Sequence, residues 1–326
     1  MRILVTGGTG FLGTRIIARM AASGHEVYAL ARSPSSQGIL AAMGAKPVEG
    51  DLESQSLALP PIDAVVHAAA HFRFAGPRKP YFRTNVDGTA ALIGAARTAG
   101  AKKLIYVSAA GIIMDDRGSP VRGADESAPA HPDSFSAYLA SKAQAEELVL
   151  GAGQPGFRTI AIRPPGIWGP GDMWTRELPA AIASGQFAFI NRGDYAYATC
   201  HVDNVVEAIE CALDRGIGGR AYFVNDQEKL TFREFIAMIA GLQGLSVETL
   251  RSMPYGLAFI VGKMMEMVWA MRCRAEDPPL SRSMVRMIGR EFSTSDAAAR
   301  QDLGYVGKTS IAQGLRQYQT AGATSG

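Results

Sequence analysis

The segment SFSAYLASKAQAEELV contains two side chains that could move a proton together, Tyr138 and Lys142. They are four residues apart, so on a helix both side chains lie on one face. A free tyrosine has a pKa of about 10, too high to exchange protons readily near neutrality. A neighbouring ammonium, like any bound cationic group, favours the phenolate and lowers that pKa, which would let Tyr138 act as a general acid or base. Such pairs are also common by chance on helix surfaces, so this one gains meaning only from its context.

Ser108 is a third candidate, in the stretch LIYVSAAG. The run from Leu104 to Val107 is apolar or aromatic throughout, which is typical of a strand covered on both faces in a parallel sheet. Such strands present their C-terminal ends to ligands. Ser108 could therefore hydrogen-bond a substrate carbonyl, or it could only end the strand, since serine favours turns for local reasons.

The chain opens with MRILVTGGTGFLGTRIIARMAASGHEVYALARS, which predicts a strand, a glycine-rich turn, an amphipathic helix ending near Gly24, and a second strand. Gly7, Gly10 and Gly13 have the spacing of a dinucleotide-binding turn. The first permits the tight turn, the second lets the backbone approach a pyrophosphate, and the third packs the helix against the strand. The phosphates would lie at the helix N-terminus. The alternative is an ordinary βα turn that is rich in glycine.

The second strand ends where a dinucleotide fold usually places an acidic residue on the adenosine ribose, and this chain has Arg32 and Ser33 there. A guanidinium and a hydroxyl suit a 2′-phosphate, so the sequence favours NADP(H) over NAD(H). The alternative is an ordinary surface arginine at a loop end.

Strand-like and helix-like segments then alternate, with a short strand before Asp51 that could bring this carboxylate to the adenine. The alternation predicts an α/β fold with a doubly wound parallel sheet, the Rossmann arrangement. We expect residues 1–165 to form the dinucleotide-binding domain. From about residue 166 the alternation loosens and aromatic residues increase, which predicts that 166–326 is mainly a smaller substrate-binding lobe, with about 199–226 returning to the main sheet.

The composition narrows the class of protein. The chain has 326 residues, 47% hydrophobic, with 33 basic and 30 acidic residues and a formal net charge of +3, so no basic surface for nucleic acid is indicated. The cysteines Cys200, Cys211 and Cys273 are odd in number and lack metal-ligand spacing, which indicates free thiols and no metal site. With no signal-peptide pattern at the N-terminus, the expected location is the cytoplasm.

Taken together, the motifs TGGTGFLG, GDL, HAAA, NVDGT, YVSAAG, YLASK, RPPGIWGPGD, HVDNV and FSTSDAAARQDLGY resemble those of the extended short-chain dehydrogenase/reductase family, the NAD(P)-dependent epimerase/dehydratase superfamily. RPPGIWGPGD and DPPLSRSMV look most like its 3β-hydroxysteroid dehydrogenase branch, which includes bacterial relatives that reduce β-keto acids. The resemblance implies that Tyr138 is the general acid/base. It also implies that Lys142 holds the nicotinamide ribose and lowers the tyrosine pKa, and that Asn85 orders the site.

The same resemblance implies that residues 163–167, RPPGI, close over the nicotinamide end, and that a hydroxyl stands on the second residue of a pair at the strand end. That second residue is Ala109, so Ser108 is the nearest hydroxyl and could point to the wrong face. The residues expected to contact the cofactor are Gly7, Gly10, Phe11, Leu12, Gly13, Arg32, Ser33, Asp51, Leu52, Ala68, Ala69, Ala70, Asn85, Tyr138, Lys142, Pro165 and Ile167.

The predicted substrate is a large apolar ketone or secondary alcohol, such as a 3-hydroxysteroid or a long-chain β-keto acid. Relatives that act on nucleotide sugars usually carry a diphosphate-binding arginine near the position of Tyr197 and Ala198, although Arg192 and Arg176 could still bind phosphate. The methionine-rich segment 253–271 predicts an amphipathic helix that lines a pocket or contacts a membrane peripherally, or else a core helix.

Two other functions stay open from the sequence. A nucleotide-sugar epimerase or dehydratase would share these motifs and hold its cofactor through the cycle. A sensor that binds NADP(H) without turnover would keep the glycine turn, and Ala109 leaves room for it. The expected assembly is a homodimer.

Overall fold

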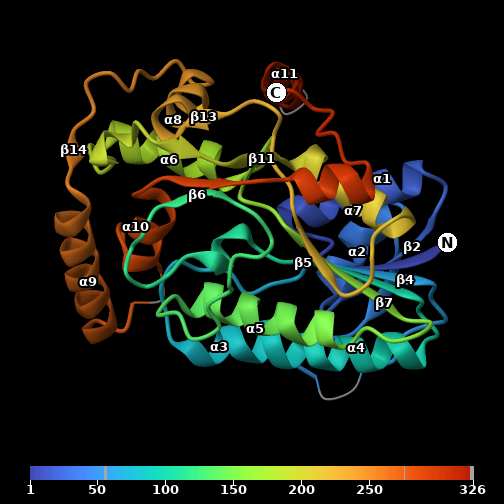
Figure 1. Ribbon diagram of the computed structural model, residues 1–326. Helices are drawn as coiled ribbons and strands as arrows, with labels where there is room; N and C mark the ends of the chain where they lie inside the picture. The colour runs from blue at the N-terminus through green and yellow to red at the C-terminus, as the bar shows by residue number, and fades with distance from the viewer. Residues whose placement is uncertain (55–56, 275, 324–326) are drawn as a thin grey trace.

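A parallel sheet of seven strands forms the centre of the structure, in the order β12-β7-β5-β4-β1-β2-β3 (Figure 1). The computed structural model describes residues 1–54, 57–274 and 276–323. The strand order reverses between β1 and β4, which confirms the doubly wound Rossmann fold. The strands are β1 (Arg2–Thr6), β2 (Glu26–Ala31), β3 (Lys46–Glu49), β4 (Ala64–His67), β5 (Lys103–Val107), β7 (Arg158–Arg163) and β12 (Arg220–Phe223).

Helices cover both faces of this sheet (Figure 1). Successive side chains of a strand point to opposite faces, so Ile3 and Val5 of β1 pack in one apolar cluster and Leu4 in another. The first cluster includes side chains of α1, α2 and α7, and the second those of α4 and α5. These helices are α1 (Phe11–Ala22), α2 (Pro34–Ala42), α4 (Gly88–Thr98), α5 (Ala137–Gly151) and α7 (Val202–Asp214).

The glycine-rich turn between β1 and α1 requires its glycines for two different reasons. Gly7 has φ +73°, and a Cβ there would lie 2.8 Å from the backbone nitrogen of Ala69. A Cβ on Gly13 would lie 1.9 Å from the carbonyl oxygen of Gly7, so this glycine lets α1 pack directly against the turn. The loop between β1 and α1 can therefore pass close to the end of β4.

The remaining elements form a lobe beside the end of the sheet, at the left of Figure 1. Its core contains the packed rings of Phe189, Tyr197, Phe232 and Phe235. Its strands are β6 (Val121–Ala124), β8 (Gly166–Trp168), β9 (Phe189–Ile190), β10 (Ala196–Tyr197), β11 (Thr199–His201), β13 (Leu230–Thr231), β14 (Ser252–Met253) and β15 (Phe292–Thr294). Its helices are α6 (Met173–Ala183), α8 (Phe232–Gly241), α9 (Tyr255–Met271), α10 (Arg282–Ile288) and α11 (Ile311–Ala323), while α3 (Arg78–Phe82) and the π-helical turn Arg83–Asp87 precede α4.

Helix α7 packs against α1, and β12 pairs with β7 at the edge of the central sheet, so part of the second half of the chain lies on the first. The boundary between domains at residues 165 and 166 stays a prediction.

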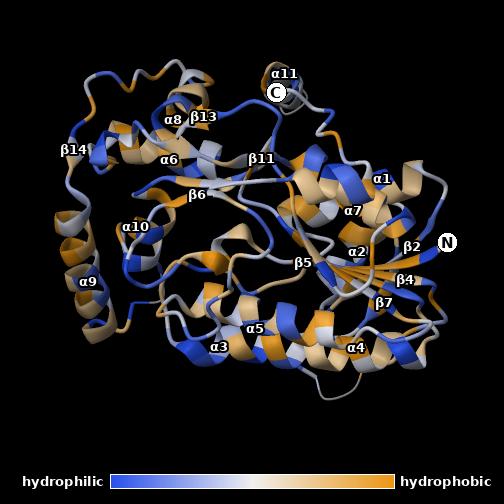
Figure 2. Cartoon of the chain, viewed as in Figure 1, coloured by the Kyte–Doolittle hydropathy of each residue, from blue (hydrophilic) through white to orange (hydrophobic). Residues whose placement is uncertain are grey.

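Helix α9 lies at the outer edge of the lobe (Figures 1 and 2). Only Tyr255, Ala258 and Gly262 of α9 are buried, so the core-helix interpretation of 253–271 is wrong. The opposite face exposes large apolar side chains at a spacing of three and four residues: Leu257, Ile260, Met264, Met267 and Met271. Within the described residues, every helix is too short or too polar to cross a bilayer.

Candidate active site

A cleft runs along the C-terminal ends of β1, β2, β3 and β4, where a doubly wound sheet binds its ligand. Its floor is the backbone of the glycine-rich turn, and the segment 68–71 after β4 forms one wall. The predicted cofactor residues that line this cleft are Gly7, Gly10, Arg32, Ser33, Asp51, Leu52, Ala68, Ala69 and Ala70.

The other predicted cofactor residues lie elsewhere. Phe11, Leu12 and Gly13 belong to the first turn of α1, where Gly13 serves packing against the turn. Asn85 is buried behind the cleft, and Pro165 and Ile167 follow β7. Residues of the cleft that the sequence reasoning missed are Thr6, Gly8, Thr9, Leu30, Ala31, Ser35, Ser36, Ile39, Gly50, Glu53, His71 and Thr84.

The end of the cleft at β2 gathers hydroxyl groups beside Arg32. Ser33 caps α2 by accepting a hydrogen bond from the Ser36 backbone nitrogen at 3.2 Å. Ser35 and Ser36 line the same end of the cleft. Arg32 takes part in none of the ion pairs found among the described residues. The sequence RSPSS at residues 32–36 indicates a phosphate site at this end of the cleft, because several hydroxyls around an arginine suit a phosphate group.

Tyr138 and Lys142 lie on α5, which begins at the capping residue Ser136. Lys142 is 2% exposed, and its Nζ donates a hydrogen bond of 2.5 Å to the carbonyl oxygen of Val107, the last residue of β5. The same ammonium lies 4.1 Å from the centre of the Tyr106 ring. Lys142 therefore joins α5 to the end of β5, beside Ser108.

Burial shifts the pKa values of Tyr138 and Lys142 in opposite directions. It raises the pKa of Tyr138 to about 12 and lowers the pKa of Lys142 to about 7, the latter opposed by the charge of Glu146. The expected lowering of the tyrosine pKa by the lysine is not found in the protein alone, because desolvation disfavours both charged forms. The protein therefore holds Tyr138 as a protonated phenol near neutrality.

Glu146 continues the row of side chains along α5, one turn beyond Lys142. Its carboxylate accepts two hydrogen bonds from Arg163 Nε, at 3.0 and 3.1 Å, and one from Arg163 Nη2 at 2.5 Å. Both side chains are buried, at 4% and 7% exposure. The Arg163 side chain is thus held by α5, and its role is to fix the end of β7 against that helix.

Ser108 is 3% exposed, and its Oγ has no hydrogen-bond partner among the described residues. Its backbone nitrogen donates to the Ile162 carbonyl at 2.7 Å, so the strand pairing continues through this residue. Ala109, where the family resemblance predicts a hydroxyl, packs in the same apolar cluster as Tyr138. An unpaired buried hydroxyl is unusual, and it leaves Ser108 able to bond to a ligand.

Asn85 lies in the π-helical turn Arg83–Asp87 and connects the loop after β4 to α5. Its amide accepts from the His71 backbone nitrogen at 2.7 Å and donates to the His71 carbonyl at 3.1 Å. It also donates to Ser141 Oγ at 2.9 Å, and Ser141 in turn donates to the Tyr138 carbonyl at 2.8 Å. These hydrogen bonds join Asn85 both to His71 in the loop after β4 and to Ser141 on α5. Asn85 therefore fixes the position of the loop relative to the helix.

His67, at the end of β4, bridges Thr6 and Thr89 with hydrogen bonds of 2.7 and 2.9 Å. Burial, aided by the charge of Lys142, lowers the pKa of His67 to about 3. This imidazole stays neutral and serves the packing of the strand ends. No cluster of His, Cys, Asp or Glu suited to a metal ion occurs among the described residues.

Phe72 is a site residue that the sequence reasoning missed. Its ring meets the Tyr138 ring edge-on at 4.7 Å and the Phe74 ring at 5.1 Å. No local pattern marks it, since HFRFAG reads as an irregular loop. Tyr138 is therefore shielded on one side by an aromatic pair from the loop after β4.

Comparison with known proteins places this geometry in context. Residues 4–255 match the family described as the 3-beta hydroxysteroid dehydrogenase/isomerase family. A relative from Stigmatella aurantiaca, 4-hydroxy-2-methyl-3-oxo-4-farnesyl-3,4-dihydroquinoline-1-oxide ketoreductase, is 36% identical, and the alignment covers 99% of this chain and 97% of the relative. A 2-alkyl-3-oxoalkanoate reductase from Stenotrophomonas maltophilia is 32% identical, with coverage of 99% and 100%.

A solved structure extends the comparison at the level of the fold. A double mutant of DesIV, a dTDP-glucose 4,6-dehydratase from Streptomyces venezuelae with NAD bound, superposes with a TM-score of 0.73 at 22% identity, covering 98% of this chain and 97% of that one. At that identity the likeness concerns the fold alone.

The buried lysine predicts a pH-dependent stability. An unfolded lysine keeps its proton up to about pH 10.5, whereas folded Lys142 loses it near pH 7. The unfolded chain thus binds more protons between these values, so Lys142 makes the free energy of unfolding rise with pH, by at most about 1.4 kcal/mol per pH unit. Urea unfolding between pH 7 and 9 should show a steeper rise for the wild type than for Lys142→Met; parallel curves would contradict the shifted pKa.

Proposed function

The chain belongs to the 3-beta hydroxysteroid dehydrogenase/isomerase family, and we propose that it reduces a large apolar ketone to a secondary alcohol with a nicotinamide cofactor. It is an NAD(P)-dependent oxidoreductase of the extended short-chain dehydrogenase/reductase type. The observation that carries the proposal is the position of Tyr138, one helical turn from the buried Lys142 at the end of β5, beside a cleft with a dinucleotide-binding turn.

The names of the relatives support the substrate class. Those of the Stigmatella and Stenotrophomonas proteins describe ketone reduction, and a relative from Mycolicibacterium neoaurum that is 29% identical is named 3-beta-hydroxysteroid dehydrogenase. All three names describe a ketone or a secondary alcohol on a largely apolar molecule, which agrees with the class that the sequence predicts.

The cleft fits a dinucleotide, because Gly7 and Gly10 keep side chains away from the floor where a pyrophosphate would lie. When bound, the nicotinamide exchanges a hydride with the reacting carbon. We propose that Tyr138 then donates its phenolic proton to the carbonyl oxygen and that Lys142 holds the nicotinamide ribose. The raised pKa keeps Tyr138 protonated near neutral pH, so its phenol is available as the proton donor for the reduction of a ketone.

Stabilisation of the developing oxyanion would come first from Tyr138 and second from Ser108, whose hydroxyl is buried and unpaired. Ala109 stands where the family resemblance predicts a hydroxyl, so Ser108 is the hydroxyl that this strand end offers. Removal of one such donor typically costs roughly 100-fold to 1000-fold in rate.

We propose NADP(H) as the preferred cofactor. Arg32 is exposed at the cleft, and Ser33, Ser35 and Ser36 lie with it at the position of the adenosine ribose. Together they offer a charge and hydroxyls to a 2′-phosphate, while a carboxylate that would bind the 2′-hydroxyl of NAD is missing from the end of β2.

The nucleotide-sugar alternative has little support from the second lobe. Tyr197 is 6% exposed and packs on the rings of Phe232 and Phe235, so a buried phenol occupies the region where a diphosphate arginine is expected. Arg176 and Arg192 are both exposed and line none of the cavities described here. The sensor alternative is weakened by the placement of Tyr138 and Lys142 at the end of the cleft.

Three further expectations stay predictions: a homodimer, a location in the cytoplasm, and peripheral contact of 253–271 with a membrane. The exposed apolar stripe of α9 supports the last of these.

For the reaction itself, we expect Tyr138→Phe to keep NADPH binding and to lower single-turnover reduction of methyl 3-oxododecanoate by at least about 100-fold, because only the transferable proton is lost. Ser108→Ala should have a smaller effect, and Tyr28→Phe, on the surface of β2, serves as the control. Reduction by Tyr138→Phe within a few-fold of the wild type would disprove the assignment; equal losses in both site variants would make Ser108 a full partner.

For cofactor choice, we expect the wild type to bind NADPH more tightly than NADH by about 1.5 to 3 kcal/mol, the scale of a charge-assisted hydrogen bond. Arg32→Ala should narrow this difference, whereas Arg251→Ala, an exposed arginine outside the cleft, should leave it unchanged. Fluorescence titration with both reduced cofactors measures it. Tighter binding of NADH by the wild type would refute the NADP(H) preference.

A further inference from the structure

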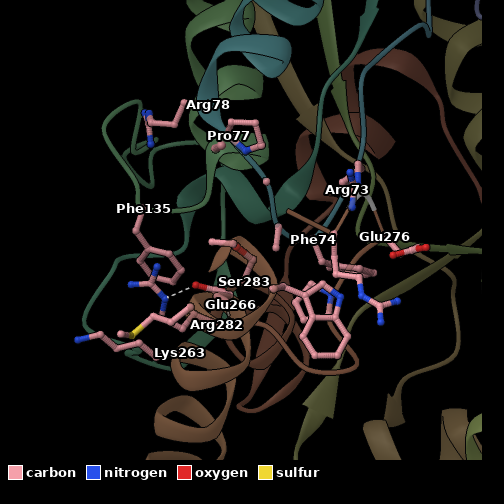
Figure 3. A pocket seen from close by; sticks show the side chains of 18 of the residues that line it. Arg73, Phe74, Pro77, Arg78, Phe135, Lys263, Glu266, Glu276, Arg282 and Ser283 are labelled. Atoms are coloured by element: carbon pink, nitrogen blue, oxygen red, sulfur yellow. Dashed lines mark hydrogen bonds and ion pairs between the residues drawn. The ribbon is translucent and has the colours of Figure 1, made fainter. Parts of the chain in front are cut away.

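A cavity of about 530 Å³ lies on the far side of the loop 71–78 from the cofactor cleft. It is walled by that loop, by Phe135 just before the catalytic helix, by one side of α9, and by the start of α10 (Figure 3). Ala137, the residue before Tyr138, belongs to the same lining. The cavity is distinct from the cofactor cleft, whose lining ends at His71 on this loop.

The inner walls of the cavity are mainly aromatic and apolar, with Phe74, Tyr81, Phe135 and Trp269 as the large rings. Trp269 Nε1 is buried and has no hydrogen-bond partner among the described residues, so it offers one donor to a ligand. A largely apolar pocket with a few placed polar groups is typical of a small-molecule site.

Four of the charged residues that line the cavity have a partner in an ion pair or a hydrogen bond: Arg73, Arg78, Glu266 and Arg282. Arg282 bonds to Glu266 at 2.7 Å, drawn as a dashed line in Figure 3, and Arg78 donates to the Ser134 carbonyl at 2.9 Å. Lys263 and Arg274 are exposed and belong to the outer rim. The deep part of the cavity therefore offers a ligand apolar surface rather than a free cation.

Two phenylalanines separate this cavity from Tyr138. Phe74 lines the cavity, Phe72 touches Phe74 at 5.1 Å, and Phe72 in turn touches Tyr138 at 4.7 Å. Phe72 is 39% exposed, so it is not locked in a core and its ring has room to turn. A substrate with its carbonyl at Tyr138 could extend past Phe72 into the cavity.

Asp277, from the segment before α10, fastens the loop that carries these rings. Its carboxylate accepts hydrogen bonds from the backbone nitrogens of Phe74 and Ala75, both at 3.1 Å, and pairs with Arg73 at 3.2 Å. The contact joins residues 203 apart in the chain. The other end of the loop, at His71, is held by Asn85.

We propose that this cavity binds the apolar chain or ring system of the substrate that lies remote from the reacting carbonyl, and that Asp277 is a positioning residue that holds the Phe72–Phe74 wall in place for it. The proposal rests on the proposed ketone reduction, since it assigns a second part of the same substrate. It also explains why the loop that carries Phe72 and Phe74 is tied to both lobes.

The first test measures binding without turnover. Trp269 lies in the cavity wall, so 2-dodecanone added without cofactor should quench the tryptophan fluorescence of the wild type, and Trp269→Phe, which keeps Trp168 and Trp174, should lose most of that response. Quenching that is equal in both proteins would overturn the cavity assignment. This readout does not depend on whether the chain reduces ketones.

The second test compares methyl 3-oxohexanoate with methyl 3-oxododecanoate at saturating NADPH. Ser283→Leu narrows the cavity and should lower kcat/KM for the long ester by about tenfold or more while sparing the short one. Phe135→Ala widens the cavity and should shift the highest kcat/KM to esters with longer chains. This second variant keeps the test decisive if Ser283→Leu folds poorly. Unchanged chain-length profiles in the folded variants would overturn the proposal, whereas no reduction of either ester by the wild type would contradict the proposed function instead.

The third test addresses Asp277. Asp277→Asn removes the charge and one acceptor, so KM for the long ester should rise by about tenfold with kcat within about twofold, and the short ester should be little affected. Glu248→Gln, an exposed carboxylate outside both cavities, is the control and should change neither constant. A uniform loss of kcat for both esters would show a general structural defect and refute the positioning role.

Discussion

The structure of the site depends on one buried amine. Lys142 is held under the end of β5 by its hydrogen bond to the Val107 carbonyl and by the face of Tyr106. Because the lysine is on α5, this bond fixes the position of α5 along the strand direction. Tyr138 is thereby placed near the edge of the sheet where the strands end. Glu146 and Arg163 secure the same helix one turn further on, against β7. Burial of charged groups is costly, and here the Lys142 ammonium and the Glu146 carboxylate each have a specific partner.

The loop after β4 has the complementary role, since it is shared by both cavities. His71 lines the cofactor cleft and Phe74 lines the second cavity, only three residues later. Asn85 fixes His71 from the side of the sheet, and Asp277 fixes Phe74 from the side of the small lobe. The cleft, Tyr138 and the second cavity therefore meet at one short segment whose position is determined by two long-range contacts.

Much of this could be predicted from local sequence patterns. The spacing of Gly7, Gly10 and Gly13 indicates the turn, the alternation of elements indicates the doubly wound sheet, and both are found. The four-residue spacing of Tyr138 and Lys142 and the serine at the end of β5 are also visible in the sequence. Such features are local because they depend on the conformation of a single strand, turn or helix.

The remainder could not be read from the sequence, for physical reasons. The raised pKa of Tyr138 follows from burial by residues such as Phe72, and burial is a property of the folded chain. Asp277 looks like an ordinary loop carboxylate, because its partners are some 200 residues away and form no motif with it. The unpaired hydroxyl of Ser108 likewise becomes visible only when every neighbour is placed.

The central claim is that the chain transfers a hydride to a ketone while Tyr138 supplies the proton. The most direct measurement is to incubate the wild-type protein with methyl 3-oxododecanoate and NADPH that carries deuterium at both C4 positions, and to analyse the product by mass spectrometry and NMR. The account predicts one deuterium per molecule, located on carbon 3 of the resulting 3-hydroxy ester, with one equivalent of NADP⁺ formed. Consumption of NADPH without label at that carbon, or no product alcohol at all, would contradict it.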